Sequence, residues 1–362
     1  MARFEVSAIF KINAQGFSLR RGASILLVML LPLVVLGALG EEKYFVSVAL
    51  GALFTGLCDP GGRYSYRAPR LGVIAVSGAL LTALGYWLGA QAWGWVALAA
   101  FLVTILAGLA VTYGARRFVA ALLLNVWFLI ALSLPSAYRA DGVHTGAWPQ
   151  ALAWLIGSGL MIGYIGLMWL AGGRSGRQQT GAELLPGDTT PVPLSRKVIM
   201  YAVIRAVAVA AAVAIAFGLD VPNADWMPVA ALVAMKPSLG QSTLVAAQRL
   251  TGTVIGAALA AAVLMGVDNK IVMGAVIVVL GGLAGAVRAV SYTWYVAAVA
   301  GTVLIAEGLP HPTALAEEAR RIGFTFAGVG IAVVVTYLAG LLAGHAAAGD
   351  RPPRTAAPRS RR

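Results

Sequence analysis

Two stretches of the chain decide its fold: Tyr44–Cys58 followed by Asp59-Pro60-Gly61-Gly62-Arg63, and Trp226–Met235 followed by Lys236-Pro237-Ser238-Leu239-Gly240. In each, a short apolar segment breaks off at a polar stretch that contains proline. A glycine-rich apolar segment follows, opened by Arg70-Leu71-Gly72 in the first case and by Arg249-Leu250-Thr251-Gly252 in the second. As a helix, an apolar segment of about 15 residues is roughly 22 Å long, less than the 30 Å hydrocarbon core of a bilayer. A duplicated interrupted helix in a membrane protein points to a ligand site between two repeats.

The composition is that of a membrane protein. Of 362 residues, 60% are hydrophobic and only 11% are charged, whereas soluble domains carry roughly 25% charged residues. Apolar runs of nearly bilayer-spanning length recur from end to end. They predict an all-α polytopic membrane protein with about 12 transmembrane helices: Ala23–Gly40, Tyr44–Cys58, Leu71–Ala90, Ala92–Tyr113, Phe118–Pro135, Trp148–Ala171, Val198–Leu219, Trp226–Gly240, Thr253–Val267, Ile271–Val287, Thr293–Leu309 and Phe324–Gly344.

The net charge is +13, and the distribution of the charged residues along the chain indicates the topology. With the N-terminus placed inside, most arginines fall in loops on the cytoplasmic side, and most acidic residues fall on the other side. This is the positive-inside bias, and it predicts that both termini are cytoplasmic. It also accounts for the basic charge without a nucleic-acid partner.

The chain divides into two halves around a linker. Residues 172–197 are rich in Gly, Pro, Thr and charge, which predicts a cytoplasmic linker between a first transmembrane repeat, 1–171, and a second, 198–346. Because six spans precede the linker, both halves enter the membrane in the same orientation. We therefore expect two parallel six-helix repeats, related by an axis along the membrane normal. The basic tail, 347–362, is predicted to be disordered in the cytoplasm, where it can touch anionic lipids.

The two breaks are candidates for the ligand site. Non-helical backbone at membrane depth is tolerated only where it is buried in protein or lines a polar cavity. Pro60 and Pro237 enforce the breaks because proline removes an amide donor, and Gly61 and Gly240 permit close turns. The helix after each break points its N-terminus toward the gap, and a helix N-terminus favours an anion.

Charged residues near the breaks or inside spans are candidates for the site, and three of them have two readings. Lys236 either lines an anion path or extends to the cytoplasmic interface, since a lysine within a span costs roughly 2.5–3.5 kcal/mol on insertion scales. Arg249 serves as a ligand residue or as an ordinary cytoplasmic anchor. Asp59 either pairs with Arg63 or carries a coupled proton. Arg205 is an intramembrane charge that needs a partner.

Other marked positions have mostly structural readings. Gly252 and Gly256 form a pair of small residues that lets helices pack closely. Trp127 and Tyr164 lie deep in their spans, where core packing is favoured over stacking on an aromatic ligand. Arg288 is predicted to lie in a loop.

Several classes of protein are disfavoured. The three histidines lack metal-ligand spacing, so no metal site is expected. A phosphate-binding glycine loop with Lys and Ser or Thr is absent, so ATP-driven transport has no support. Because acids and histidines do not converge in the spans, we expect neither an enzyme nor a cofactor. The lone cysteine, Cys58, excludes an intramolecular disulfide.

The second break and the segment after it carry a family resemblance. The residues are Trp226-Met227-Pro228-Val229-Ala230-Ala231-Leu232-Val233-Ala234-Met235-Lys236-Pro237-Ser238-Leu239-Gly240 and Gln248-Arg249-Leu250-Thr251-Gly252-Thr253-Val254-Ile255-Gly256. This motif at 226–256 resembles the signature of the fusaric acid resistance family. That family includes the aromatic acid exporters and is distantly similar to plant aluminium-activated malate transporters. Its characteristic segment corresponds to Lys236, Pro237, Ser238, Arg249 and Gly252, and a weaker first-half counterpart to Asp59, Pro60 and Arg70.

The resemblance implies a function. It suggests an exporter in the bacterial plasma (inner) membrane, driven by the proton motive force, for small aromatic or other organic carboxylate anions. Implied partners are membrane lipids, a periplasmic adaptor protein and, by analogy, a second copy in a homodimer. The candidate substrate-binding residues are Lys236, Pro237, Ser238, Arg249, Arg205 and Arg63, with Asp59 as the proton carrier. The long cytoplasmic domain that many exporters insert between their halves is missing, which leaves the substrate and the adaptor open. A passive organic-anion channel and a non-transport membrane scaffold are the alternatives.

Overall fold

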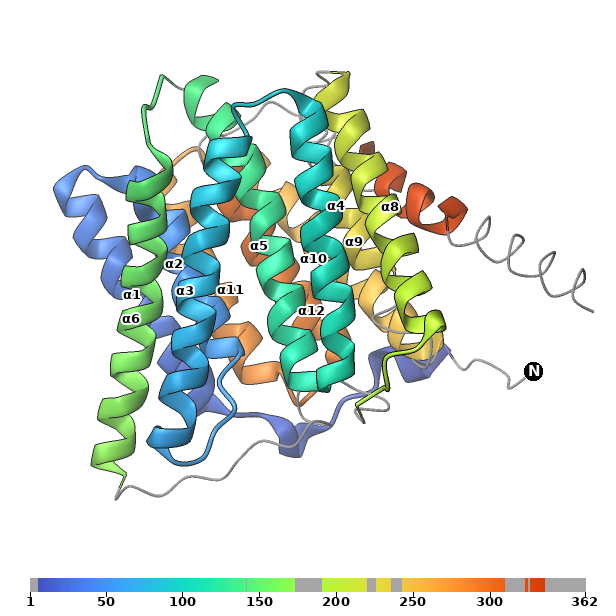
Figure 1. The fold of residues 1–362 in the computed structure, drawn as a ribbon. Coiled ribbons are helices and arrows are strands. Elements are labelled where there is room, and N and C mark those ends of the chain that lie inside the picture. Colours follow the sequence, from blue (N-terminus) through green and yellow to red (C-terminus); the bar gives the residue numbers. More distant parts are fainter. Residues whose placement is uncertain are drawn as a thin grey trace, which may run out of the picture.

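The computed structural model describes residues 6–140, 142–172, 191–219, 226–235, 243–309, 323–324 and 326–335. These residues form helices and no strand (Figure 1). Among them, eight helices are long and apolar enough to cross a membrane: α1 Leu19–Leu39, α3 Tyr64–Leu88, α4 Trp93–Leu109 with the short η4 Ala110–Tyr113, α5 Ala115–Ala140, α6 Ala147–Ala171, α8 Arg196–Gly218, α10 Thr243–Gly266 and α11 Lys270–Val287. The protein is thus a multi-pass all-α membrane protein.

Shorter helices complete the described part of the chain. They are η1 Val6–Phe10, η2 Ala14–Gly16, η3 Glu42–Tyr44, α2 Phe45–Leu57, α9 Trp226–Ala234, α12 Tyr292–Gly308 and the helix Phe326–Val335. Both segments that the sequence marks as short, α2 and α9, are short helices here. The total of twelve spans and the repeat layout stay predictions.

The outer face of the bundle is apolar. Large aliphatic side chains on α1, α3, α4, α6 and α8 are exposed, among them Leu27, Val34, Val73, Leu80, Leu102, Leu106, Leu152, Leu167 and Val207. A soluble monomer rarely exposes so much contiguous apolar surface. Contact with lipid hydrocarbon is the environment that this face suits.

Helix α2 forms the centre of the first half. All 13 of its residues are buried, and it packs on α6 and α1. Two buried hydrogen bonds tie it to α6: the Ser47 hydroxyl donates to the Gln150 amide oxygen (2.5 Å), and the Thr55 hydroxyl donates to the Ser158 hydroxyl (3.0 Å). The helix therefore touches protein on every side.

Two pairs of helices make most of the contact between the two halves of the chain. Helix α1 packs along α11. Helix α4 packs along α8, and these two lie side by side in Figure 1. Within the halves, α3 packs on α5 and α6, while α10 packs on α12.

Two helices begin earlier than the sequence suggested. Helix α3 begins at Tyr64, although the apolar run opens at Leu71, and α10 begins at Thr243 rather than Thr253. A proline usually ends a helix, but Pro69 lies inside α3. Pro69 lies close to the start of the helix. Because proline has no N–H group, only the Ser65 carbonyl loses its hydrogen bond within the helix, and Ser65 is exposed to water. The first break is therefore confined to residues 58–63.

An N-terminal strap, residues 6–18, crosses the bundle from the second half to α1 (Figure 1). The Thr293 hydroxyl donates to the Ile9 carbonyl (2.6 Å), and the Gln248 amide donates to the Ala8 carbonyl (3.2 Å). The strap therefore covers the ends of α10 and α12.

Candidate functional site

Positive charge gathers at one end of the bundle, where α1, α3, α5, α8 and α10 begin. We call this the basic end, and it carries Arg20, Arg21, Arg63, Arg67, Arg70, Arg116, Arg117, Arg196, Lys197, Arg249 and Arg288. The opposite end has a mixed set: Glu41, Glu42, Lys43, Arg139, Asp268 and Lys270. Both short helices, α2 and α9, end toward the basic end.

The first break turns sharply at its glycines. Gly61 and Gly62 have φ values of +69° and +89°, in the left-handed region that glycine enters at little cost. The Gly61 amide donates to the Asp59 carboxylate (3.1 Å), and Pro60 is buried beside it. The chain thus reverses within a few residues between α2 and α3.

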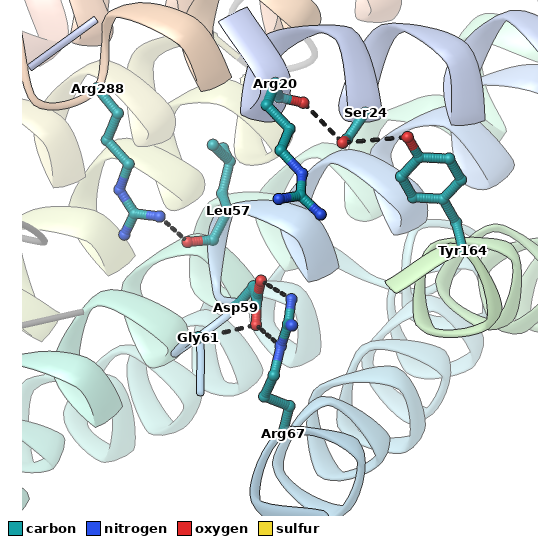
Figure 2. A network of polar contacts seen from close by, with 8 residues as sticks. All are labelled: Arg20, Ser24, Leu57, Asp59, Gly61, Arg67, Tyr164 and Arg288. Carbon is teal, nitrogen blue, oxygen red and sulfur yellow. Dashed lines mark hydrogen bonds and ion pairs between the residues drawn. The ribbon is translucent and has the colours of Figure 1, made fainter. Parts of the chain in front are cut away.

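Asp59 pairs with Arg67 and not with Arg63. Arg67 donates through Nε to Asp59 Oδ1 (2.7 Å) and through Nη2 to Oδ2 (Figure 2). Arg63 precedes α3 and is exposed, so the pairing offered from the sequence is wrong. Both partners of the observed pair are mostly buried, and bidentate arginine–carboxylate pairs are strong. A proton-carrying role for Asp59, which stays a prediction, requires Arg67 to move away first.

Arg288 joins the two halves at this break. It follows α11 in a turn, as expected of a loop residue, but its side chain is only 5% exposed. Its Nη1 donates to the carbonyl of Leu57, the last residue of α2 (Figure 2). A cation at a helix C-terminus satisfies a free carbonyl and opposes the negative end of the dipole. Within the described part of the chain, Nε and Nη2 of Arg288 have no hydrogen-bond partner.

Two further arginines are buried in the second half. Arg205 lies about 14 Å along α8 and is 1% exposed. None of its three guanidinium nitrogens has a partner among the described residues. Arg249, on α10, is 4% exposed and leaves Nη1 without a partner in the same part of the structure. The two lie close enough for their charges to interact.

Tyrosines lie between the arginines. Tyr201 is close to both Arg205 and Arg249, and Tyr292 and Tyr295 are close to Arg249. The Tyr295 ring centroid lies 6.0 Å from Cζ of Arg288. We call this set the arginine–tyrosine cluster: Arg205, Arg249, Arg288, Tyr201, Tyr292 and Tyr295.

The cluster has an excess of positive charge. Among the described residues, the ion pairs are Lys43–Glu41 and Arg67–Asp59, and neither involves the cluster. An arginine at the centre of a membrane helix costs roughly 2.5–3.5 kcal/mol on insertion scales, and mutual repulsion adds to this. An anion bound between the guanidinium groups would offset both terms.

Sequence analysis found only part of this cluster. Arg205 and Arg249 were candidates, whereas Arg288 and the three tyrosines were missed. A signal was present, because Tyr201 and Arg205 are one helical turn apart, as are Tyr292 and Tyr295. Polar side chains one turn apart within an apolar run lie on the same face of their helix, so they point toward the same neighbouring helix.

The remaining candidates have other placements. An added Cβ at Gly252 would lie 2.5 Å from the Thr293 carbonyl oxygen, and one at Gly256 would lie 2.6 Å from that of Ala297. These glycines let α10 and α12 approach closely. The segment with Lys236, Pro237, Ser238 and Gly240 lies outside the described residues.

Of the two deep aromatic residues, Trp127 is fully buried and Tyr164 is half-buried. Trp127 stacks on Trp154 with ring centroids 4.8 Å apart and donates to the Thr82 hydroxyl (2.7 Å). The Tyr164 hydroxyl meets that of Ser24 at 3.3 Å (Figure 2). Among the described residues, no group of three His, Cys, Asp or Glu side chains could hold a metal ion.

Residues 198–335 match a family model described as fusaric acid resistance protein-like. On this match, residues 198–335 resemble a fusaric acid resistance protein-like domain. The matched range begins in α8 and contains every member of the arginine–tyrosine cluster. No curated protein and no solved structure matches the chain. The domain and the apolar helices together indicate a multi-pass membrane transporter of the fusaric acid resistance type.

Proposed function

We propose that this fusaric acid resistance protein-like protein exports small organic carboxylate anions, aromatic ones among them, across a bacterial inner membrane, driven by the proton motive force. The observation that carries the proposal is the arginine–tyrosine cluster, in which each of three buried guanidinium groups has at least one nitrogen without a hydrogen-bond partner among the described residues. A carboxylate accepts bidentate hydrogen bonds from arginine. The tyrosines add hydroxyl groups and ring faces that suit a ligand with an aromatic body.

The second break belongs to the same proposed site. Helix α9 packs on α8, which carries Arg205, and it touches α10, which carries Arg249. The chain leaves α9 at the buried Met235, the last described residue before the segment with Lys236, Pro237 and Ser238. We include that segment in the site on this ground.

Helix packing supports two parallel repeats. The contact of α1 with α11 has a counterpart in the contact of α8 with α4, where each first helix meets the fourth helix of the other half. An added Cβ at Gly157 of α6 would overlap the Val48 carbonyl of α2. One at Gly328 would overlap the Met227 carbonyl of α9. Such correspondence suits a carrier in which the halves move against each other, with the basic end cytoplasmic.

Uptake into inverted membrane vesicles tests the proposal. Radiolabelled 4-hydroxybenzoate is offered with and without a proton gradient to the parent protein, Arg249→Gln and Arg205→Gln. We expect gradient-dependent uptake that falls about tenfold or more in each variant, since a loss of 1.4 kcal/mol is tenfold in affinity. Lys197→Gln is the matched control, because Lys197 is an exposed cation at the start of α8. It should stay within about twofold of the parent, far less than 1.4 kcal/mol.

The other outcomes identify the alternatives. Uptake that is equally fast without a gradient would favour a passive anion channel. Absence of flux for every acid tested would favour a membrane scaffold. Full uptake by Arg249→Gln and Arg205→Gln, at normal protein abundance, would remove the cluster from the site.

A further inference from the structure

A cavity of about 780 Å³ lies at the basic end of the first half, between the beginnings of α3 and α5. We call it the first-half vestibule. Tyr66 and Arg70 of α3 line one wall, Arg116 and Arg117 of α5 line the other, and Cys58 of the first break is also in the lining. The volume lies within the range of roughly 300–1,000 Å³ typical of small-molecule sites.

Arginines and aromatic rings hold one another in this vestibule. Cζ of Arg70 lies 3.6 Å from the Tyr66 ring centroid, and Nη1 of Arg116 donates to the Tyr66 hydroxyl (3.0 Å). Cζ of Arg117 lies 5.4 Å from the Tyr113 ring centroid. Cation–π contacts of this kind fix a guanidinium without neutralising it. The charges of Arg70 and Arg117 are therefore not neutralised by these contacts.

Among the described residues, the vestibule lining contains no carboxylate. Asp59, one residue beyond Cys58, is already bound on both oxygens by Arg67. The rest of the lining is apolar, with Val73 and Ile74 on α3 and Ala121 and Leu124 on α5. A cytoplasmic anchoring role explains arginines at this end, but such a role requires neither a cavity nor apolar walls.

The vestibule ends where the two halves meet. Cys58 directly follows Leu57, whose carbonyl accepts the hydrogen bond from Arg288 of the arginine–tyrosine cluster. Charge interactions also link Arg288 with Cys58 and Tyr295. Basic groups therefore continue from Arg70 and Arg117, past the end of α2, to the buried cluster.

We propose that the first-half vestibule binds an amphiphilic anion, with its acidic group on Arg70 and Arg117 and its apolar body against α3 and α5. The same chemistry belongs to a small aromatic carboxylate and to the head group of an anionic lipid. Binding here stands on the vestibule alone. Its use as the entrance for exported acids rests on the proposed function.

Cys58 supplies the test, because it is the one cysteine of the chain and lines the vestibule. Purified protein in phosphatidylcholine nanodiscs is treated with an anionic sulfonatoethyl or a cationic trimethylammonioethyl methanethiosulfonate, and the two labelling rates are divided. Partial burial of the thiol slows both reagents, and the ratio removes this effect. We expect the anionic reagent to label the parent protein faster than the cationic one. The ratio of the anionic to the cationic rate should fall about tenfold in Arg70→Gln/Arg117→Gln, a change of about 1.4 kcal/mol. Lys197→Gln should retain the parent ratio, and Cys58→Ser gives the background.

Protection from labelling identifies the ligand. Slower labelling in the presence of 4-hydroxybenzoate or 2-naphthoate supports an organic acid, and slower labelling only in phosphatidylglycerol nanodiscs supports a lipid head group. Protection by neither, or an unchanged charge preference in Arg70→Gln/Arg117→Gln, would overturn the proposal. Arg249→Gln should leave protection intact, so failure of the proposed transport site can be distinguished from failure of this one.

Discussion

Arg205 shows how function and stability oppose each other at the residue scale. It lies within an apolar helix, is 1% exposed, and has no hydrogen-bond partner for its guanidinium among the described residues. Its nearest aromatic contact is the Phe118 ring, with Cζ 5.7 Å from the centroid. Replacing buried charge by an apolar side chain of similar volume is often stabilising by about 1–4 kcal/mol. A charge kept at such a cost is expected where a ligand needs it.

We therefore predict that Arg205→Met raises the thermal stability of the purified protein by a few degrees and abolishes anion uptake. The stability gain comes from removing an unpaired buried charge, by the ~1–4 kcal/mol quoted above. Thermal unfolding in detergent and vesicle uptake are measured on the same preparation. Val203→Met, on the exposed face of the same helix, should change neither. Lower stability together with normal uptake would show that Arg205 has a structural role.

We predict that the Asp59–Arg67 ion pair stabilises the turn between α2 and α3 at the first break. Asp59→Asn or Arg67→Gln alone should lower stability by about 1–3 kcal/mol, because each leaves a mostly buried partner unpaired. The double variant should recover part of that loss. A double-mutant cycle of thermal unfolding checks this, with Arg63→Gln as the exposed neighbour that changes little. Strictly additive losses would contradict a direct pair.

A site residue can be predicted from the sequence when a short window around it already shows that it is unusual. Arg205 stands out because a charge in an apolar run is anomalous by itself. The partner of Asp59 could not be identified, because it depends on where α3 begins and on the turn at Gly61 and Gly62. Arg288 resembles any loop arginine until packing places it against the end of α2. Such placements depend on tertiary contacts that no short window contains.

At the scale of single helices, α2 depends on one close backbone approach. An added Cβ at Gly157 of α6 would overlap the Val48 carbonyl of α2, while Gly159 on the same helix has open space. Because α2 is buried on all sides, it has no lipid face toward which it can shift. We predict that Gly157→Ala sharply reduces the yield and melting temperature of folded protein. Gly159→Ala should be neutral or stabilise by up to about 1 kcal/mol through helix propensity.

Size-exclusion profiles and thermal unfolding compare these two glycine variants. Equal behaviour of Gly157→Ala and Gly159→Ala would mean that α6 can move away from α2 without loss. The outcome also bears on the proposed repeat, since Gly328 has the same relation to α9.

Helix existence was easier to predict than helix ends. The apolar segments of α2 and α9 are short in the sequence and short in the structure, because length and hydropathy are properties of the segment itself. The starts of α3 and α10 were placed too late. The first turns of α3 carry polar and basic residues at the bundle end, where water satisfies the helix. In α10, the buried Gln248 and Arg249 interrupt the apolar run that the prediction followed.

For the whole molecule, the proposed transport requires the two halves to shift along the α1–α11 and α4–α8 contacts. At the second contact, an added Cβ at Gly108 would lie 3.0 Å from the Ala202 Cβ, slightly below the usual disulfide separation of about 3.5–4.5 Å. A Gly108→Cys/Ala202→Cys pair in a Cys58→Ser background should therefore form a cross-link between the halves on oxidation.

We predict that this cross-link stops transport and that reduction restores it, because a carrier cannot change its access side while its halves are joined. The control is Thr55→Cys/Ser158→Cys, which joins α2 and α6 within the first half, where the native hydroxyl oxygens are 3.0 Å apart. Its oxidation should leave most of the flux. Uptake is measured in vesicles before and after reduction, with cross-linking followed by gel mobility. If the oxidised Gly108→Cys/Ala202→Cys protein transported as fast as the reduced one, the halves need not move, and a fixed anion pore would explain the flux.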